Sequence, residues 1–247
     1  MIREESMGIK NSKPIEEILG GNTYPGRGIV VGKSADGKSA VGAYFIMGRS
    51  ENSRNRVFSE KGTTVVTEPF DASKVADPSL ILYTAVRAYK NKLILTNGDQ
   101  TDTVASFLRE KKSFRAALES REFEPDSPNF TPRISAMLCF EEGDFSYEMS
   151  ILKSADAHGS ACNRFFFCYE PLPGTGHLIH TYQTDGEPLP SFQGEPVPVE
   201  IPDGIGVFTD SLWQSLNEEN KVSLYVRYTD PASGETETRL VNKHRKC

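Results

Sequence analysis

The chain has 247 residues, of which 37% are hydrophobic and 25% charged, and its formal net charge is -6. This composition is typical of a globular protein with a substantial core, and an acidic balance without a basic stripe disfavours a long nucleic-acid footprint. No window reaches the roughly 18 uncharged apolar residues of a membrane span. The N-terminus also lacks the apolar core of a signal peptide, so we expect a cytoplasmic protein.

Residues 1–23 are polar apart from a weak helical stretch at Ile15–Leu19, and we expect them to form an extension to a single domain spanning residues 24–247. From Gly26 onward, β-branched and apolar runs alternate with turn residues, a pattern typical of strands and hairpins. The strands predicted in chain order are Gly28–Val31, Ala40–Met47, Thr63–Thr67, Thr84–Tyr89, Leu93–Thr96, Ile134–Phe140, Tyr147–Leu152, Arg164–Tyr169, Leu178–Tyr182, Val222–Tyr228 and Thr236–Val241.

Helix signals gather in the middle of the chain and near its end. Thr101 and Asp102 are predicted to cap a first helix, and Ser113 to start a second. A third is predicted at Asp210–Leu216, while the proline-rich stretch Glu187–Pro202 indicates an irregular connection. Many strands with few helices predict an α+β fold with largely antiparallel sheets.

The cysteines and histidines give no sign of a metal site. The four cysteines form no C-x-x-C pair, which favours reduced structural thiols. His177 and His180 lie three residues apart in a predicted strand, where alternation sends their side chains to opposite faces. We therefore expect no bound metal.

The segment Arg49–Arg56 concentrates three arginines among serines and asparagines in an otherwise acidic chain. Planar, always-charged guanidinium groups suit bidentate capture of a phosphate or carboxylate. A solvated loop would have the same composition, and the segment alone does not decide between the two.

Other polar clusters stand at predicted strand ends or turns, where scaffolded sites usually lie. One is Thr96–Thr103, in which Asn97-Gly98 permits a tight turn and the helix start after it leaves backbone donors free for an anion or a polar ring edge. Helix capping by Thr101 and Asp102 would satisfy the same donors. The sequence contains no G-x-S-x-G, Walker A, H-E-x-x-H or G-x-G-x-x-G motif.

Taken in order, these clusters resemble the archaeal-type IMP cyclohydrolase family. The matching segments are Tyr24-Pro-Gly-Arg27, Arg49-Ser50 with Arg54, Pro78 with Tyr83, Asn97-Gly98 with Thr101-Asp102-Thr103, Glu124 with Asp126, and Thr131-Pro-Arg133 through Ala136. The resemblance implies a four-layer αββα fold like that of the N-terminal-nucleophile hydrolases, without their chemistry.

The reaction that this resemblance implies is closure of 5-formamidoimidazole-4-carboxamide ribonucleotide to inosine monophosphate (IMP), with loss of water and no cofactor. Tyr83 is then the leading catalytic candidate, as a donor of a hydrogen bond or proton. Its ungapped spacing to Arg54 favours that arginine as the neighbouring cation, with Arg56 as second choice and Arg27 as a further alternative. Glu124 is a candidate proton acceptor. The resemblance further implies substrate binding by Arg27 or Arg133 at the 5′-phosphate, by Asn97 and Asp102 at the carboxamide or ribose, and by Arg56.

Two other classes of function remain open. The chain could be a purine-nucleotide-binding protein without turnover, or an amidohydrolase of related fold that acts on another amide. Tyr83 could in either case simply pack against Leu80 and Leu82. A purine ribonucleotide is the expected partner, and a homo-oligomer is compatible with the sequence.

Overall fold

The computed structural model describes residues 11–75 and 82–244, and its strands form two sheets. The six-stranded sheet contains, in spatial order, β11 (Val197–Glu200), β10 (Thr175–His180), β1 (Arg27–Lys33), β2 (Ala40–Met47), β12 (Lys221–Thr229) and β13 (Thr236–Asn242). The seven-stranded sheet contains β3 (Arg56–Lys61), β4 (Thr64–Pro69), β5 (Thr84–Tyr89), β6 (Lys92–Thr96), β7 (Arg133–Glu141), β8 (Asp144–Ser154) and β9 (Cys162–Tyr169).

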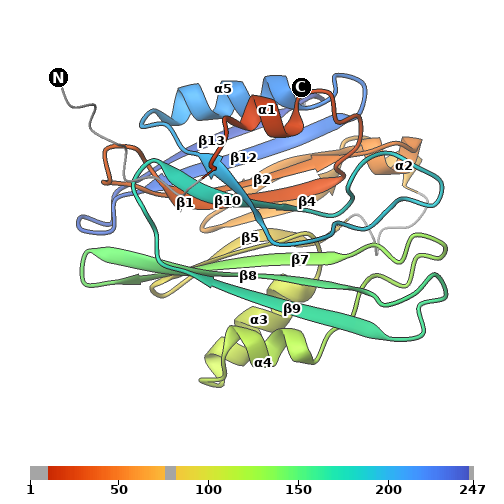
Figure 1. The fold of residues 1–247 in the computed structure, drawn as a ribbon, viewed down its shortest axis with the longest axis horizontal. Coiled ribbons are helices and arrows are strands. Elements are labelled where there is room, and N and C mark those ends of the chain that lie inside the picture. Colours follow the sequence, from red (N-terminus) through yellow and green to blue (C-terminus); the bar gives the residue numbers. More distant parts are fainter. Residues whose placement is uncertain (1–10, 76–81, 245–247) are drawn as a thin grey trace.

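The described helices lie outside the two sheets. They are α1 (Ile15–Leu19), α2 (Glu51–Arg54), α3 (Gln100–Arg109), α4 (Phe114–Glu119) and α5 (Ile205–Ser215), with a 3-10 turn at Ala72–Lys74. Figure 1 shows α1 and α5 above one sheet and α3 and α4 below the other, with the sheets stacked between them. All strand pairs within the described sheets are antiparallel, which confirms the predicted α+β class. None of the described helices is long and apolar enough to cross a membrane.

The alternation of side chains along each strand explains this layering. In β2, Tyr44 and Ile46 point into the hydrophobic layer between the sheets, whereas Phe45 and Met47 point toward α5. Both faces of β2 are therefore covered, and all of its residues are buried. A third hydrophobic cluster fills the space between the seven-stranded sheet and the helices α3 and α4.

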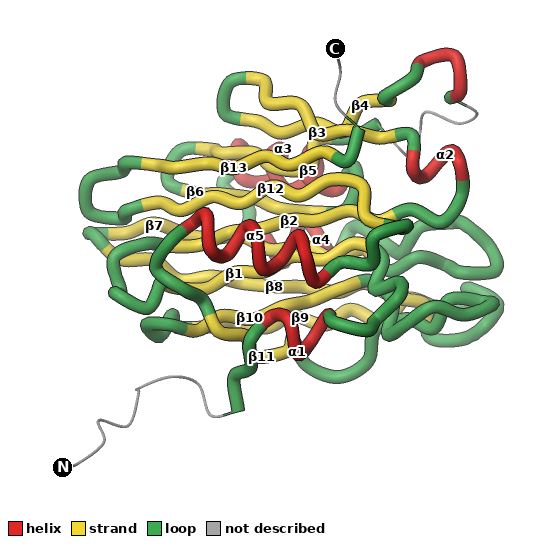
Figure 2. The backbone as a smooth tube through the Cα atoms, turned by 90° about the horizontal axis from the view of Figure 1, so that it is seen from above, coloured by secondary structure: helices red, strands yellow, loops and turns green. Residues whose placement is uncertain are grey.

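The segment before residue 24 packs on the six-stranded sheet. Ile15 and Leu19 of α1 are buried in the same cluster as Phe208 and Leu212 of α5. Figure 2 shows α5 running along this sheet, with α1 nearer to β10 and β11. One apolar face on each helix is enough to hold it there.

Several predicted boundaries are wrong, and each has a local cause. Helix α3 begins at Gln100 with Asp99 as its N-cap, so Thr101 and Asp102 lie inside its first turn. Helix α5 begins at Ile205, earlier than predicted. Its N-cap Gly204 has no capping side chain, and the poor helix former Gly206 lies in the first turn, so the sequence does not mark this start. The proline-rich stretch contains β11, an edge strand that tolerates Pro198.

The predicted start of α4 at Ser113 is confirmed, since its side chain caps the helix by accepting from the Ala116 N–H. The strands Ala40–Met47 and Thr84–Tyr89 are confirmed with their predicted bounds.

The antiparallel order brings the site segments to one end of the sheet pair. β1 begins at Arg27 beside the end of β2 and close to the end of β10. In the other sheet, β6 ends at Thr96 opposite Ser135, near the start of β7. Segments from across the chain therefore meet at the same edge.

Candidate active site

A cavity of about 310 Å³ lies at this end of the molecule. It is lined by Tyr24, Gly26, Arg27, Met47, Arg49, Ser50, Asn52, Ser53, Arg56, Glu124, Asp126, Asn129, Thr131, Tyr182 and Leu189. Three of the predicted site residues, Arg27, Arg56 and Glu124, are in this set. The wall combines cations, carboxylates and aromatic rings from segments far apart in the sequence.

Arg27 and Glu124 form a buried bidentate ion pair in the wall of the cavity. Arg27 Nη1 and Nη2 donate to Glu124 Oε1 and Oε2 at 2.9 and 3.1 Å, and Nη1 also donates to the Asn97 carbonyl at 2.9 Å. Burial alone would lower the pKa of Arg27, but Glu124 and the phenols of Tyr83 and Tyr44 raise it well above its usual value. Arg27 therefore provides a permanent positive charge beside two phenols.

The Tyr83 hydroxyl lies 2.7 Å from that of Tyr44. Tyr44 is fully buried in β2, and burial raises its pKa well above the usual value of a phenol. The Tyr83 backbone is fixed as well, because its N–H donates to Thr67 Oγ1 at 2.9 Å and its carbonyl accepts from the Thr67 N–H at 2.9 Å. Tyr83 is only 8% exposed and is rigidly held just before β5.

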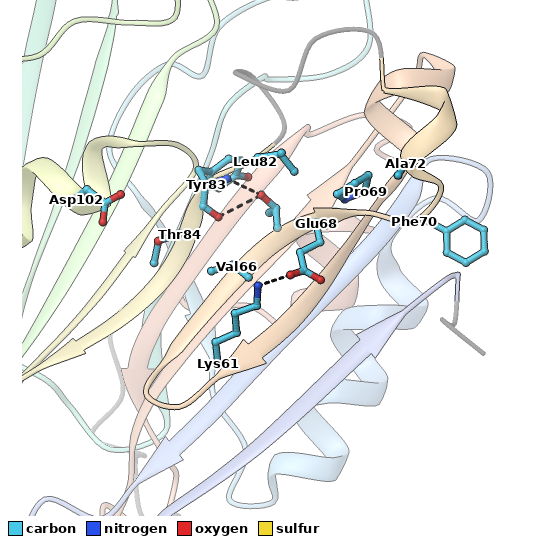
Figure 3. Close-up of a pocket in the computed structure, with 11 residues that line it drawn as sticks. Lys61, Val66, Glu68, Pro69, Phe70, Ala72, Leu82, Tyr83, Thr84 and Asp102 are labelled. Carbon is cyan, nitrogen blue, oxygen red and sulfur yellow. Dashed lines mark hydrogen bonds and ion pairs between the residues drawn. The ribbon is translucent and has the colours of Figure 1, made fainter.

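Tyr83 lines a second, wider depression of about 660 Å³, shown in Figure 3. Glu68, Leu82, Tyr83 and Asp102 contribute to its lining, and Lys61 forms an ion pair with Glu68 across β3 and β4. Pro78 of the matching segment and Leu80, an expected packing partner of Tyr83, lie outside the described residues.

Aromatic rings form another wall of the 310 Å³ cavity. The rings of Tyr24 and Tyr182 are stacked with centroids 5.9 Å apart, and the Arg49 guanidinium lies 5.2 Å from the centroid of Tyr24. Arg49 also donates to Asp185 at 2.6 Å and to the Gly186 carbonyl at 3.0 Å, which anchors the loop after β10. Such a wall suits a planar ring.

The arginine-rich segment is a structured turn. Ser50 and Ser53 form a capping box at α2, and β3 follows directly at Arg56. Arg54 turns away from the cavity and donates to the Gly48 carbonyl at 2.9 Å and to Asn220 Oδ1 at 2.8 Å. Arg56 lines the cavity, where it donates to the carbonyls of Ser53 and Met47 at 2.7 and 3.1 Å.

The remaining predicted residues have other surroundings. The Asn97 amide is occupied inside the protein: it donates to the Pro132 carbonyl at 2.8 Å and accepts from the Ile134 N–H at 3.0 Å. Asp102 pairs with Arg87 at 2.6 Å and lines the depression of Figure 3.

Arg133 lies behind the cavity wall and pairs with Asp99 at 2.7 Å. Burial lowers its pKa, while the nearby Glu124 and Asp99 oppose that effect. The structure thus brings Arg27, Arg56 and Glu124 together, with Tyr83 and Arg133 adjacent, and separates Arg54 and Asp102 from them.

Most of the cavity residues were absent from the predicted set, among them Asp126, Thr131 and Tyr182. Asp126 and Thr131 occur in the matched segments, so their identity was visible although their contact was not. Tyr182 joins them from the end of a strand in the other sheet. Among residues 11–75 and 82–244, no three His, Cys, Asp or Glu side chains are grouped to hold a metal ion.

Chemically, the cavity offers fixed cations for an anion, an aromatic wall for a flat ring, and phenols and carboxylates for proton movement.

Residues 24–235 match a family described as IMP cyclohydrolase-like protein. The chain is 36% identical over 163 residues to the IMP cyclohydrolase of Methanopyrus kandleri, covering 64% of this chain and 75% of that protein. It is 34% identical over 119 residues to the IMP cyclohydrolase of Methanococcus aeolicus, covering 47% of this chain and 58% of that protein.

Proposed function

The chain belongs to the family of IMP cyclohydrolase-like proteins, and from this premise we propose that it closes 5-formamidoimidazole-4-carboxamide ribonucleotide to IMP, with loss of water. The observation that carries the proposal is the buried Arg27–Glu124 pair in the wall of a cavity that also has an aromatic wall. Tyr83 lies outside the cavity lining, but its phenol is near enough to Arg27 to help raise the pKa of that guanidinium. A fixed cation and phenol hydroxyls beside a flat-ring site suit ring closure on a heterocycle.

In the proposed reaction, the carboxamide nitrogen attacks the formyl carbon and gives up one proton, and the formyl oxygen becomes the hydroxyl of a carbinolamine. This attack closes the ring. The hydroxyl then leaves as water with the proton of the formamide nitrogen, and a C=N bond forms between that nitrogen and the former formyl carbon. Holding the two groups in contact supplies much of the rate, on the order of 7–11 kcal/mol in favourable intramolecular systems.

Tyr83 acts in this proposal on the formyl oxygen. If Tyr44 donates its hydroxyl proton to Tyr83, the proton of Tyr83 is free to stabilise the oxyanion as it forms. The positive charge of Arg27 supports the same oxygen, and Glu124 keeps that charge in place through both of its carboxylate oxygens.

Substrate binding is divided among the cavity cations. Arg56, which lines the cavity, is the proposed phosphate ligand in preference to Arg54. The stacked pair Tyr24 and Tyr182 takes the imidazole ring. Asn97 contributes through its carbonyl, which accepts from Arg27, and Arg133 adds positive charge behind the wall. The proposed substrate contacts of Asn97 and Asp102 would require their side chains to leave their present partners.

We further propose that residues 24–247 are one domain of the four-layer αββα type found in the N-terminal-nucleophile hydrolases. The helix–sheet–sheet–helix order visible in Figure 1 supports this assignment.

The test is to incubate the purified protein with the formamido ribonucleotide and follow IMP by absorbance. We expect turnover, and we expect Tyr83→Phe to lower kcat by about 100-fold or more. The same change should cost about 1–3 kcal/mol of stability, because the buried Tyr44 hydroxyl loses its partner. The control is Tyr147→Phe, which removes a buried phenol hydroxyl that bonds His177 Nδ1 instead. Binding of IMP without any acceleration would instead support a non-catalytic nucleotide-binding protein, and hydrolysis of simple amides would support an amidohydrolase.

A further inference from the structure

A short hydrogen-bond chain runs from a carboxylate through a hydroxyl to a phenol in the cavity wall. Thr131 Oγ1 contacts Asp126 Oδ2 on one side and lies 2.5 Å from the Tyr182 hydroxyl on the other. The Thr131 N–H donates to Asp126 Oδ1 at 2.6 Å, which fixes the carboxylate. Thr131 is 2% exposed and Tyr182 5%, and all three side chains line the cavity.

The direction of this chain follows from counting protons. An ionised carboxylate can only accept, and a threonine hydroxyl has one proton to give. Thr131 must therefore donate to Asp126, which leaves its oxygen to accept from Tyr182. Burial raises the pKa of the Tyr182 phenol, so the phenol donates a hydrogen bond to Thr131 without losing its proton. The free lone pair of the Tyr182 oxygen is then the group available to a ligand.

This arrangement offers what the Arg27–Glu124 pair lacks. Both oxygens of Glu124 accept from Arg27, so a substrate proton would have to compete with a guanidinium for them. No ion pair joins Asp126 to another residue in the described part of the chain. Its carboxylate is connected to the cavity by hydroxyl groups that can pass a proton on.

We propose that the Tyr182 oxygen accepts the proton that the carboxamide nitrogen loses, with Asp126 as the final acceptor. This role rests on the proposed cyclisation. The nitrogen's proton passes to Tyr182 Oη, the phenol proton passes to Thr131 Oγ1, and the threonine proton passes to Asp126 Oδ2. Each hydroxyl ends with one proton, and only Asp126 changes charge. The chain then runs in reverse and gives one proton to the oxyanion, which becomes the carbinolamine hydroxyl.

The most informative variant is Asp126→Asn, because it keeps the shape of the side chain but reverses the direction of the hydrogen bonds. The amide oxygen can still accept from the Thr131 N–H, while the amide nitrogen now donates to Thr131 Oγ1. Thr131 then donates to Tyr182, and the phenol proton turns into the cavity. An acceptor for the substrate becomes a donor.

The experiment measures kcat, KM and the Kd of IMP for Asp126→Asn, Tyr182→Phe, Thr131→Val and Thr131→Ser. We expect about a 100-fold loss of kcat in the first three, with KM and Kd changed less than about 3-fold. Thr131→Ser keeps the hydroxyl and should retain most of the activity. The double variant Asp126→Asn with Tyr182→Phe should be no slower than the slower single variant, since the two residues act as one unit.

Matched controls remove the same groups elsewhere. Asp156→Asn alters an exposed carboxylate that accepts from the N–H groups of His158 and Ser160, and Tyr147→Phe alters a buried phenol. Both should keep wild-type kcat.

The outcomes separate the two proposals. An inactive wild-type protein would refute the proposed function. An active wild type whose Tyr182→Phe variant keeps kcat within about 3-fold would refute the chain alone, as would losses that multiply in the double variant. Tyr182→Phe deletes only one oxygen, so it decides the question even if Asp126→Asn fails to fold.

Discussion

Arg27 and Glu124 lose most of their hydration when the protein folds and form an ion pair with each other instead. Their side chains are 10% and 8% exposed, so neither charge is well solvated. Removing one partner from a buried pair leaves an uncompensated charge, at a cost of roughly 3–5 kcal/mol. The pair therefore contributes to the stability of the fold as well as to the charge of the site.

Glu124→Ala should accordingly lower the free energy of unfolding by about 3–5 kcal/mol. Urea denaturation followed by circular dichroism measures the loss. Its control is Glu122→Ala, two residues earlier, where the carboxylate is 68% exposed and lies 3.6 Å from Arg164. That change should cost less than about 1 kcal/mol, and equal losses in the two variants would contradict this account of the buried pair.

The two arginines that flank Asn55 give a second prediction at the residue scale. Arg56→Ala should weaken IMP binding by about 10-fold or more, because a hydrogen-bonded charge contributes about 1.5–3 kcal/mol. Arg54→Ala should change the affinity much less, since its guanidinium bonds Gly48 and Asn220 outside the cavity. Isothermal titration calorimetry with IMP measures both. A larger loss in Arg54→Ala would favour the spacing argument from sequence over the cavity geometry.

At the scale of elements, the turn from β6 into α3 has no room for a side chain at Gly98. A Cβ there would lie 2.5 Å from Arg133 Nη1 and 2.7 Å from Gln100 Oε1, and Gln100 also accepts from Arg133 at 2.7 Å. Gly98→Ala should displace this arginine and destabilise the protein by about 1–3 kcal/mol. IMP affinity should fall with it.

Gly206 in α5 provides the control of opposite sign. A Cβ at this helical position meets nothing within 4 Å. Gly206→Ala should therefore raise stability by up to about 1 kcal/mol, because alanine is the better helix former. Thermal unfolding of both variants compares the two; stabilisation by Gly98→Ala would show that the turn can adapt.

Helices and strands with a clear pattern of apolar or capping residues were predictable from the sequence, and those whose pattern is interrupted by glycines or charges were not. The alternating or continuous apolar runs of β2 and β5 gave their bounds, and Ser113 marked α4 through its capping hydroxyl. Glycines hid the first turn of α5. Strand β3 was hidden because it begins at Arg56, the last residue of the charged segment Arg49–Arg56. For the site, the order of the segments that resemble the IMP cyclohydrolase family indicated Arg27 and Glu124. The contact of Thr131 with Tyr182 joins residues 51 positions apart, and no local pattern indicates such a pairing.

At the scale of the whole molecule, the sheet pair buries two histidines that have no acidic partner within residues 11–75 and 82–244. His180 bonds the Tyr182 carbonyl through Nδ1 at 2.7 Å, and His177 bonds Tyr147. Burial lowers the pKa of each to about 4. Both rings are therefore neutral in the folded protein at neutral pH.

This burial predicts that the protein loses stability in mild acid. An unfolded histidine takes up a proton as the pH falls below about 6.5, while the folded ring resists until about pH 4. The stabilisation is thus complete above about pH 6.5 and is lost progressively as the pH falls toward 4. For His180 the loss between pH 7 and pH 5 is on the order of 2 kcal/mol. Urea denaturation at several pH values measures the slope, and His180→Phe, which keeps the ring contact with Phe192, should flatten it. An unchanged slope in that variant would place the acid sensitivity elsewhere in the molecule.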